Sequence, residues 1–229
     1  MNLLEWLLEG TIPVAGGVLR VPEVLGNVFG LASALLGMRR KVWAWPVGIL
    51  GNVLLFTVFV GNEVLRPTEE PLWGQAGRQV FFLAVSLYGW VRWARARRTG
   101  AAPDGGAIVP RWAGRRNRTG LVVVATVMYA VLVPVLERIG SYGPPTEAWI
   151  LTGSILATYG MARGWVEFWL IWILVDVVGV TTLVRVGFYP TAVMYAVYGG
   201  FCVWGFVNWT RTQQRLAPAE RPVATEVGA

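Results

Sequence analysis

Long apolar blocks, separated by short polar turns or by turns rich in glycine and proline, run through the whole chain. Seven of these blocks approach the roughly 20 residues that a helix needs to cross the apolar core of a bilayer. The predicted spans cover residues 20–38, 42–60, 77–94, 119–139, 147–163, 164–184 and 188–210. Before them, the first 16 residues set leucines and Trp6 against Glu5 and Glu9, which predicts a short interfacial helix. The pattern predicts an all-α integral membrane protein with seven transmembrane helices.

The composition agrees with this class and removes several others. Apolar residues make up 55% of the chain and charged residues 14%, whereas about a quarter of the residues of a soluble domain are charged. The chain has one cysteine, one lysine and no histidine. These counts argue against a disulfide framework, a zinc site and a P-loop, and we expect no cofactor and no metal.

The basic residues are distributed unevenly between the two sides of the predicted spans. Of the 20 lysines and arginines, 15 lie in the loops after the first, third and fifth spans and in the C-terminal tail. The positive-inside rule then places the N-terminus outside and the C-terminus in the cytoplasm of a multi-pass protein of the cell membrane. It also explains the net charge of +7 without nucleic-acid binding. Residues 99–118 and 211–229 are polar, and we expect a mobile loop and tail there.

The two ends of the chain resemble each other. An offset of 124 residues aligns Trp45 with Trp169 and Asn52 with Asp176, and an offset of 116 aligns residues 88–93 with 204–209. Chance similarity between aromatic-rich segments is the alternative explanation. Two three-helix units of the same orientation need an odd linking span, so the repeat predicts a 3+1+3 parallel architecture. The predicted parts are an N-terminal interfacial segment (1–19), a first repeat (20–94), a basic loop with the linking helix (95–146), a second repeat (147–210) and a cytoplasmic tail (211–229).

Asp176 is the most informative polar residue inside a span, because a carboxylate in the membrane is expensive and usually functional. It lies 12 residues beyond Gly164, which is about 18 Å along a helix and therefore near the middle of the bilayer. Asn52, its partner in the repeat, lies at a similar depth. Two polar groups at one depth predict a shared central site at the repeat interface. The alternative is a hydrogen bond that only holds the bundle together.

The sixth span carries the string Glu167-x-Trp169-x-x-Trp172-x-x-x-Asp176. At 100° per residue its last three named side chains share one helix face, and the first lies to the side, nearer the cytoplasm. Aromatic planes combined with amide, carboxylate and phenol groups suit a flat heterocycle that bears hydroxyls. Most other tryptophans fit interfacial belts, but Trp172 is too deep for one. The residues expected to face this helix are Gln79, Tyr195 and Tyr198.

Three motifs in order resemble the PnuC family of vitamin transporters over roughly residues 20–210. They are Trp43-Ala44-Trp45-Pro46-x-Gly48 after an arginine pair, the string from Glu167 to Asp176, and a tyrosine-rich last span ending in Gly205-x-x-x-Trp209. The resemblance implies a fold related to the SWEET sugar transporters, facilitated diffusion of an unphosphorylated vitamin that cytoplasmic phosphorylation traps, and homotrimers. By motif, the substrate-binding candidates are Trp45, Asn52, Gln79, Glu167, Trp169, Trp172, Asp176, Tyr195 and Tyr198.

Within that family the cargo is nicotinamide riboside, riboflavin or thiamine. Residues 161–169 and 175–180 are most similar to the riboflavin transporters of the RibM type from actinobacteria. We therefore expect riboflavin as the small-molecule partner, beside membrane lipid, with nicotinamide riboside transport as the alternative. An intramembrane enzyme is disfavoured because the chain lacks histidine and has one cysteine. The repeat and the short loops disfavour a seven-span receptor.

Overall fold

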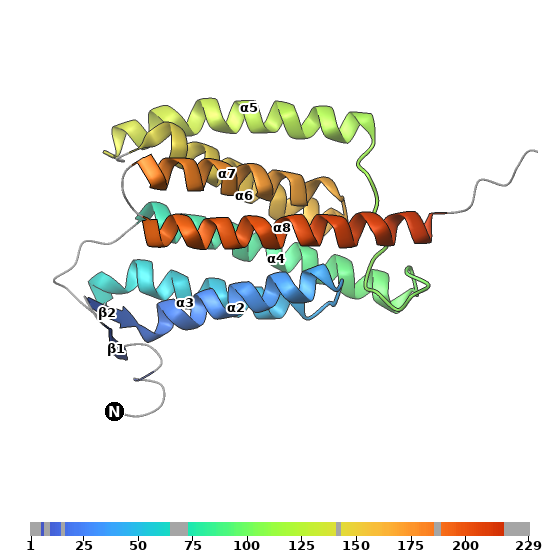
Figure 1. Cartoon of the computed structure of the whole chain (residues 1–229), viewed down its shortest axis with the longest axis horizontal. Helices are drawn as coiled ribbons and strands as arrows, with labels where there is room; N and C mark the ends of the chain where they lie inside the picture. The colour runs from blue at the N-terminus through green and yellow to red at the C-terminus, as the bar shows by residue number, and fades with distance from the viewer. Residues whose placement is uncertain are drawn as a thin grey trace, which may run out of the picture.

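Seven long helices and a short hairpin make up the part of the chain that the computed structural model describes, namely residues 6, 10–14, 17–64, 73–140, 143–185 and 189–217. Figure 1 shows the helices lying side by side along the long axis of the molecule. Each predicted span matches one helix, which confirms the prediction of a seven-helix protein. The helices are α2 (Val21–Met38), α3 (Ala44–Val64), α4 (Trp73–Arg98), α5 (Arg115–Arg138), α6 (Pro144–Arg163), α7 (Glu167–Arg185) and α8 (Tyr189–Leu216).

The sequence explains where several of these helices begin and end. Proline occupies the first turn of α2 and of α6, where its missing N–H breaks no helical hydrogen bond. Glu23 and Glu147 lie in the same turns, where a negative charge favours the positive end of the helix dipole. Gly164 ends α6 with a φ of 73°, a left-handed conformation that glycine adopts without strain.

The N-terminal segment differs from the expectation. Strands β1 (Thr11–Val14) and β2 (Gly17–Arg20) form an antiparallel pair in which Thr11 lies opposite Arg20. The predicted interfacial helix over the first 16 residues is therefore wrong for residues 11–14, because β-branched side chains there favour extended backbone. Trp6 is helical, and its carbonyl accepts a 2.9 Å bond from Gly10 N–H. The rest of the first nine residues lies outside the described part.

The helices pack in two groups of three. In the first group α3 packs against α2 and α4, and in the second α7 packs against α6 and α8. Contacts between α4 and α6 join the groups, and α5 packs on α6 at the edge of the molecule (Figure 1).

The turns that follow α2 and α6 have the same geometry at positions 124 residues apart. Arg40 and Gly164 both have positive φ, 53° and 73°. Lys41 N–H donates to the Leu36 carbonyl at 2.9 Å, and Trp165 N–H donates to the Gly160 carbonyl at 3.0 Å. The two turns thus share one hydrogen-bond pattern.

Tight contacts between helices recur in the same register. In the first group, a Cβ on Gly89 of α4 would lie 2.5–2.6 Å from ring carbons of Trp45 on α3. In the second group, a Cβ on Gly205 of α8 would meet the same ring carbons of Trp169 on α7. Each glycine lets a neighbouring indole pack against its helix backbone.

Large apolar side chains cover the outside of the bundle. On α5, Val122, Val127 and Val131 are 65%, 58% and 56% exposed. Two helices of the described residues, Val21–Met38 and Arg115–Arg138, are long and apolar enough to cross a membrane, with mean hydropathies of 1.4 and 2.3. Such extensive apolar exposure is typical of a surface that contacts lipid or a partner rather than water.

The segment between α4 and α5 is anchored to both groups. Ala107 N–H donates to the Arg40 carbonyl at 2.9 Å, and Arg111 N–H donates to the Gly164 carbonyl at 3.0 Å. Ala102, Ala107 and Ala113 are buried. The expectation of a mobile loop is therefore wrong over residues 102–113, because the exposed turns of both groups provide carbonyls that this segment satisfies. We call these residues the bridging segment.

An ion pair also holds the bridging segment. The Arg40 guanidinium binds the Asp104 carboxylate and donates from Nη1 to the Ile108 carbonyl at 3.0 Å. Its hydrogen bonds to Asp104 hold the pKa of that carboxyl below its ordinary value. Arg40 is itself buried, so this pair fixes the segment against the end of α2.

Candidate functional site

Asp176 lies in the middle of α7 and is 6% exposed. Its Oδ2 is buried and has no hydrogen-bond partner within the described residues. The α8 backbone passes close to the carboxyl at Gly199, where a Cβ would lie in ordinary van der Waals contact with Asp176 Cβ at 3.5 Å. The Cys202 thiol, also on α8, faces the same carboxyl. The carboxylate therefore keeps an acceptor free for an external donor.

Two of the predicted candidates, Tyr195 and Tyr198, lie on α8, the helix that packs against α7. Tyr195 and Tyr198 both lie near enough to Asp176 to interact with it electrostatically. Tyr195 also packs on α7, where a Cβ on Gly179 would lie 3.2 Å from its Cγ. The structure therefore brings three of the predicted site residues together at the α7–α8 contact.

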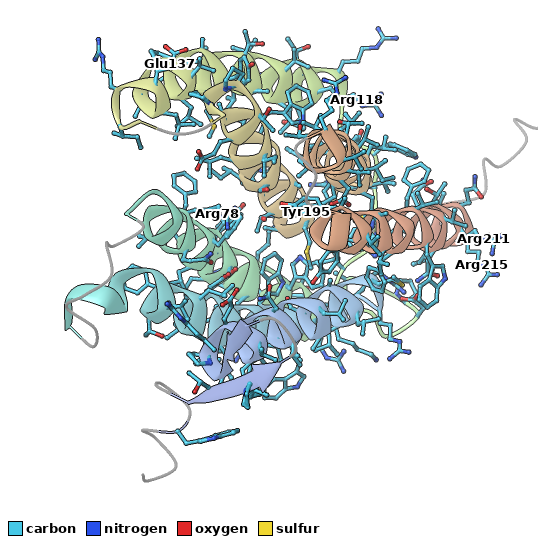
Figure 2. The ribbon with its side chains drawn as sticks, turned by 60° about the vertical axis from the view of Figure 1, so that its left-hand side comes forward. Arg78, Arg118, Glu137, Tyr195, Arg211 and Arg215 are labelled. Atoms are coloured by element: carbon cyan, nitrogen blue, oxygen red, sulfur yellow. The ribbon has the colours of Figure 1, made fainter. Side chains whose placement is uncertain are left out.

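Arg78 on α4 lies next to this group from the other side. It interacts electrostatically with Tyr195 and with Glu147 of α6, and its buried Nε has no hydrogen-bond partner within the described residues. Figure 2 shows the labelled Arg78 and Tyr195 side chains near each other, one from each helix. A guanidinium donor thus lies close to an acidic and phenolic cluster.

The two predicted amides lie in the first group of helices. Gln79 follows Arg78 on α4 and is 2% exposed, with a buried Oε1 that has no partner within the described residues. Asn52 is half-buried on α3. Gln79 is thus a second buried acceptor available to a ligand.

Trp45 and Trp169 lie in a separate aromatic cluster with Trp93, Phe168 and Trp209, which we call the tryptophan floor. Trp45 meets Trp93 edge to face at a centroid distance of 5.3 Å, and Trp169 meets Trp209 in the same way at 6.1 Å. Cys202 belongs to the same buried cluster, and Trp172 is half-buried against it. Since Cys202 also faces Asp176, the floor lies directly beside the polar group.

Glu167 is placed apart from the other candidates. It is the first residue of α7, nine positions before Asp176, so the two lie about 14 Å apart along the helix. Its carboxylate accepts two bonds from Ala113 N–H, at 2.9 and 3.0 Å, and one from Arg118 Nε at 2.7 Å. Glu167 thus binds the bridging segment and the start of α5.

Asp176 Oδ2 on α7 and Gln79 Oε1 on α4 are buried acceptors, and Arg78 Nε on α4 is a buried donor, without partners within the described residues. Trp172 lies one turn before Asp176 on the same face of α7. Buried polar atoms without partners are unfavourable, so the arrangement favours a ligand that supplies hydroxyl or N–H donors and a carbonyl. A flat ring system with polar edges and a hydroxylated chain has these groups.

Three residues of this region were not among the sequence candidates. They are Arg78 on α4, Glu147 on α6 and Cys202 on α8. The signal for Arg78 was available, because an arginine directly before a buried glutamine inside an apolar helix is a functional candidate by default. Nothing local in the sequence singles out Cys202.

Comparison with known proteins identifies relatives of the whole bundle. The model of the family described as nicotinamide mononucleotide transporter matches residues 20–211. The riboflavin/roseoflavin transporter RibM of Streptomyces davaonensis is 37% identical over 195 residues, which cover 84% of this chain and 86% of that protein. The nicotinamide riboside transporter PnuC of Escherichia coli is 24% identical over 225 residues, covering 86% and 89%.

A solved structure has the same fold. The crystal structure of the vitamin B3 transporter PnuC aligns with a TM-score of 0.64 and 19% identity, and the alignment covers 86% of this chain and 83% of that one. The likeness extends over almost the whole seven-helix bundle.

Proposed function

The chain belongs to the nicotinamide mononucleotide transporter family, and we propose that it is a membrane transporter that takes up riboflavin and flavin analogues. The 37% identity to RibM across most of both chains is the observation that carries the cargo assignment. The sequence resemblance to RibM-type proteins in residues 161–169 and 175–180 favours the same cargo.

The proposed architecture is a 3+1+3 parallel repeat of the SWEET type, with α5 as the linking helix. The matched turns at Arg40 and Gly164 and the matched contacts of Gly89 and Gly205 support this arrangement. The positive-inside rule supports a cytoplasmic position for the bridging segment and the end of α8. The homotrimer implied by the family resemblance stays a prediction.

In the proposed binding mode, the isoalloxazine ring stacks on Trp172, Tyr195 and Tyr198. Asp176 and Gln79 accept hydrogen bonds from the ribityl hydroxyls or from the ring N–H, because their oxygens are the buried acceptors without partners. Arg78 donates to a ring carbonyl. Asn52, at the corresponding depth of the first group, completes the set.

Three of the sequence candidates have roles other than binding the polar groups of the substrate in this proposal. Trp45 and Trp169 belong to the tryptophan floor, so we assign them to closing the site at its cytoplasmic side. Their indole Nε1 atoms are buried without partners within the described residues. In this proposal the two indole rings contact the substrate only from its cytoplasmic side. Glu167 is assigned to holding the bridging segment, since its carboxylate is occupied by Ala113 and Arg118.

Transport would proceed by alternating access. The polar site lies on the outer side of the tryptophan floor, and the bridging segment ties the two groups together beyond it. Opening towards the cytoplasm therefore requires the two three-helix groups to move apart at the floor. No nucleotide-binding motif is present in the sequence, so we propose facilitated diffusion with trapping by cytoplasmic phosphorylation.

Nicotinamide riboside is the second candidate cargo. The observation in its favour is Asp176, since a carboxylate oxygen without a partner within the described residues suits the positive charge of a pyridinium ring. The family also includes proteins named nicotinamide riboside transporters, at 24% identity.

The decisive experiment is a titration of the purified protein with riboflavin, followed by flavin and tryptophan fluorescence. Nicotinamide riboside and thiamine serve as competitors. Saturable quenching that flavins alone reverse is the expected result. If riboflavin causes no quenching and nicotinamide riboside shifts the thermal melt, the proposed cargo becomes nicotinamide riboside, and the description of the fold does not change.

A further inference from the structure

A cleft of about 560 Å³ lies between the start of α3 and the end of α4, on the outer surface of the first group of helices. We call it the α3–α4 cleft. Three cations and two tryptophans line it together with Pro46: Lys41, Arg97, Arg98, Trp43 and Trp90. Trp43 and Trp90 are 70% and 41% exposed, so their rings are available to a molecule in the cleft. No carboxylate lines the cleft.

The surface next to the cleft is apolar towards the middle of both helices. Leu50 and Leu87, about one turn from Pro46 on α3 and from Trp90 on α4, are exposed apolar side chains outside the cleft lining. Towards the end of α4 the surface becomes basic, and Arg97 uses one of its donors on the Gly105 carbonyl at 3.1 Å. An occupant that matches both parts has an apolar tail and an anionic head.

The second group of helices has a corresponding position, and the chain fills it with its own residues. At the offsets of the repeat, Glu167 corresponds to Trp43 and Phe206 to Trp90. The Trp112 ring lies 6.1 Å from the Phe206 ring, edge to face, and Arg118 covers Trp112 while it pairs with Glu167. An aromatic ring and a neutralised ion pair therefore occupy this place in the second group.

The cations of the first group are absent from the corresponding positions of the second. Gln213 and Gln214 correspond to Arg97 and Arg98, and Trp165 corresponds to Lys41. The shared helix packing does not require these charges, because the second group packs without them. In the first group they concentrate positive charge at an unfilled aromatic cleft.

We propose that the α3–α4 cleft binds one anionic phospholipid, with its phosphate on Lys41, Arg97 and Arg98 and its glycerol and first acyl carbons on Trp43, Trp90 and Pro46. Basic clefts between transmembrane helices bind anionic headgroups, and tryptophan favours the depth where headgroup and acyl chain meet. The site lies on the outer surface of the bundle, away from Asp176, and is independent of which vitamin is carried.

Native mass spectrometry of the full-length protein in detergent tests this proposal, with phosphatidylglycerol and phosphatidylcholine as probes. We expect one phosphatidylglycerol to bind at least tenfold more tightly than phosphatidylcholine. Arg97→Gln/Arg98→Gln, which gives α4 the residues that α8 carries, should remove this preference, a loss of roughly tenfold for two surface cations. The matched control, Arg211→Gln/Arg215→Gln, removes two exposed cations from the end of α8 (Figure 2) and should change the affinity less than twofold.

Equal losses in the two double variants would overturn the proposal, because they would reveal diffuse attraction to any basic surface. Displacement of the lipid by inorganic phosphate would also overturn it and assign the cleft to a free anion. Loss of an oligomer in Arg97→Gln/Arg98→Gln, without any lipid adduct on the native protein, would assign the cleft to a second copy of the chain. Lys41→Gln provides an independent single-charge variant with the same expected direction.

Discussion

Asp176 is a buried carboxylate whose Oδ2 has no partner within the described residues, so its replacement removes no hydrogen bond of that atom. We expect Asp176→Asn to weaken riboflavin binding about tenfold or more, the value of a hydrogen bond to a charged group, and to leave the melting temperature unchanged or higher. Fluorescence titration and a thermal melt measure the two effects. Thr181→Val, further along the exposed face of α7, is the control. Normal affinity together with a large loss of stability would assign Asp176 to holding the bundle.

Trp172 is half-buried against the tryptophan floor, so one side of its ring is available to a ligand. If riboflavin stacks there, Trp172→Ala should weaken binding by about 1–3 kcal/mol, and Trp172→Phe should restore most of it. Trp204→Ala serves as the control, because Trp204 is 59% exposed on α8. Equal affinities of the wild-type protein and Trp172→Ala would leave this ring a packing role only.

Cys202 is the single cysteine of the chain and faces the Asp176 carboxyl, which makes it a natural reporter of the site. The thiol is only 8% exposed, so N-ethylmaleimide reaches it when the contact between α7 and α8 opens, and a ligand bound to the Asp176 carboxyl would hold that contact closed. We therefore expect saturating riboflavin to slow modification of Cys202 by N-ethylmaleimide several-fold. The reaction is followed by intact mass, with thiamine as the control ligand. Identical rates with and without riboflavin would place the ligand elsewhere.

Periodicity could predict part of the arrangement around Asp176. Tyr195 and Tyr198 are three residues apart and share a helix face, so the sequence could place them opposite Asp176. It also placed Glu167 to the side of this face, but it could not show that the Glu167 carboxylate accepts from Ala113 N–H, 54 positions away. Arg78 was missed because its position relative to Tyr195 depends on how α4 and α8 pack.

Among the elements, the structure of the bridging segment could not be predicted from local sequence patterns. Its hydrogen bonds join Arg40 to Asp104 and Ile108, residues 64 and 68 positions apart, and local composition carries no information on such pairs. The helices were predicted to within a few residues because each contains a long apolar block. The β1–β2 hairpin was missed because two four-residue strands leave too short a pattern.

The Arg40–Asp104 ion pair fixes the bridging segment, and its dependence on pH has a defined sign. The pKa of Asp104 is lowered in the folded protein, so the pair stabilises the segment above the ordinary carboxyl pKa of 3.8 and is lost as the pH falls through the lowered value. Protection of the Ala107 amide from hydrogen exchange should therefore persist from pH 8 to pH 5.

Asp104→Asn mimics the protonated carboxyl and should raise exchange across residues 102–108 at pH 7. Hydrogen exchange with mass spectrometry measures this change. Glu137→Gln, an exposed carboxyl on α5 that is labelled in Figure 2, is the control and should change nothing in that segment. Unaltered exchange in Asp104→Asn would mean that the backbone bonds of Ala107 and Arg111 hold the segment without the ion pair.

At the scale of the whole molecule, the two groups of helices share the same turn geometry and helix packing but differ in the residues at some equivalent positions. The equivalent turns at Arg40 and Gly164 have the same hydrogen-bond pattern, and the carbonyls of both residues accept hydrogen bonds from the bridging segment. The groups differ at the proposed sites. Asp176 stands where the first group has Asn52, and Arg97 and Arg98 of the α3–α4 cleft stand where the second group has Gln213 and Gln214. A rocking motion between such groups would leave each internally rigid.

This rigidity is testable at Gly89 and Gly205, where each helix backbone contacts an indole. An added methyl would overlap the ring of Trp45 in one case and of Trp169 in the other, and such overpacking costs about 1–3 kcal/mol. We expect Gly89→Ala and Gly205→Ala to lower the melting temperature by similar amounts. Replacing the facing tryptophan by leucine should offset each loss. Gly120→Ala, on the open face of α5 with no atom near its Cβ position, should leave the melting temperature unchanged or raise it, because alanine favours the helix over glycine. A loss confined to one of the two glycines would show that the groups differ in packing and would remove the structural basis for a symmetric rocking motion.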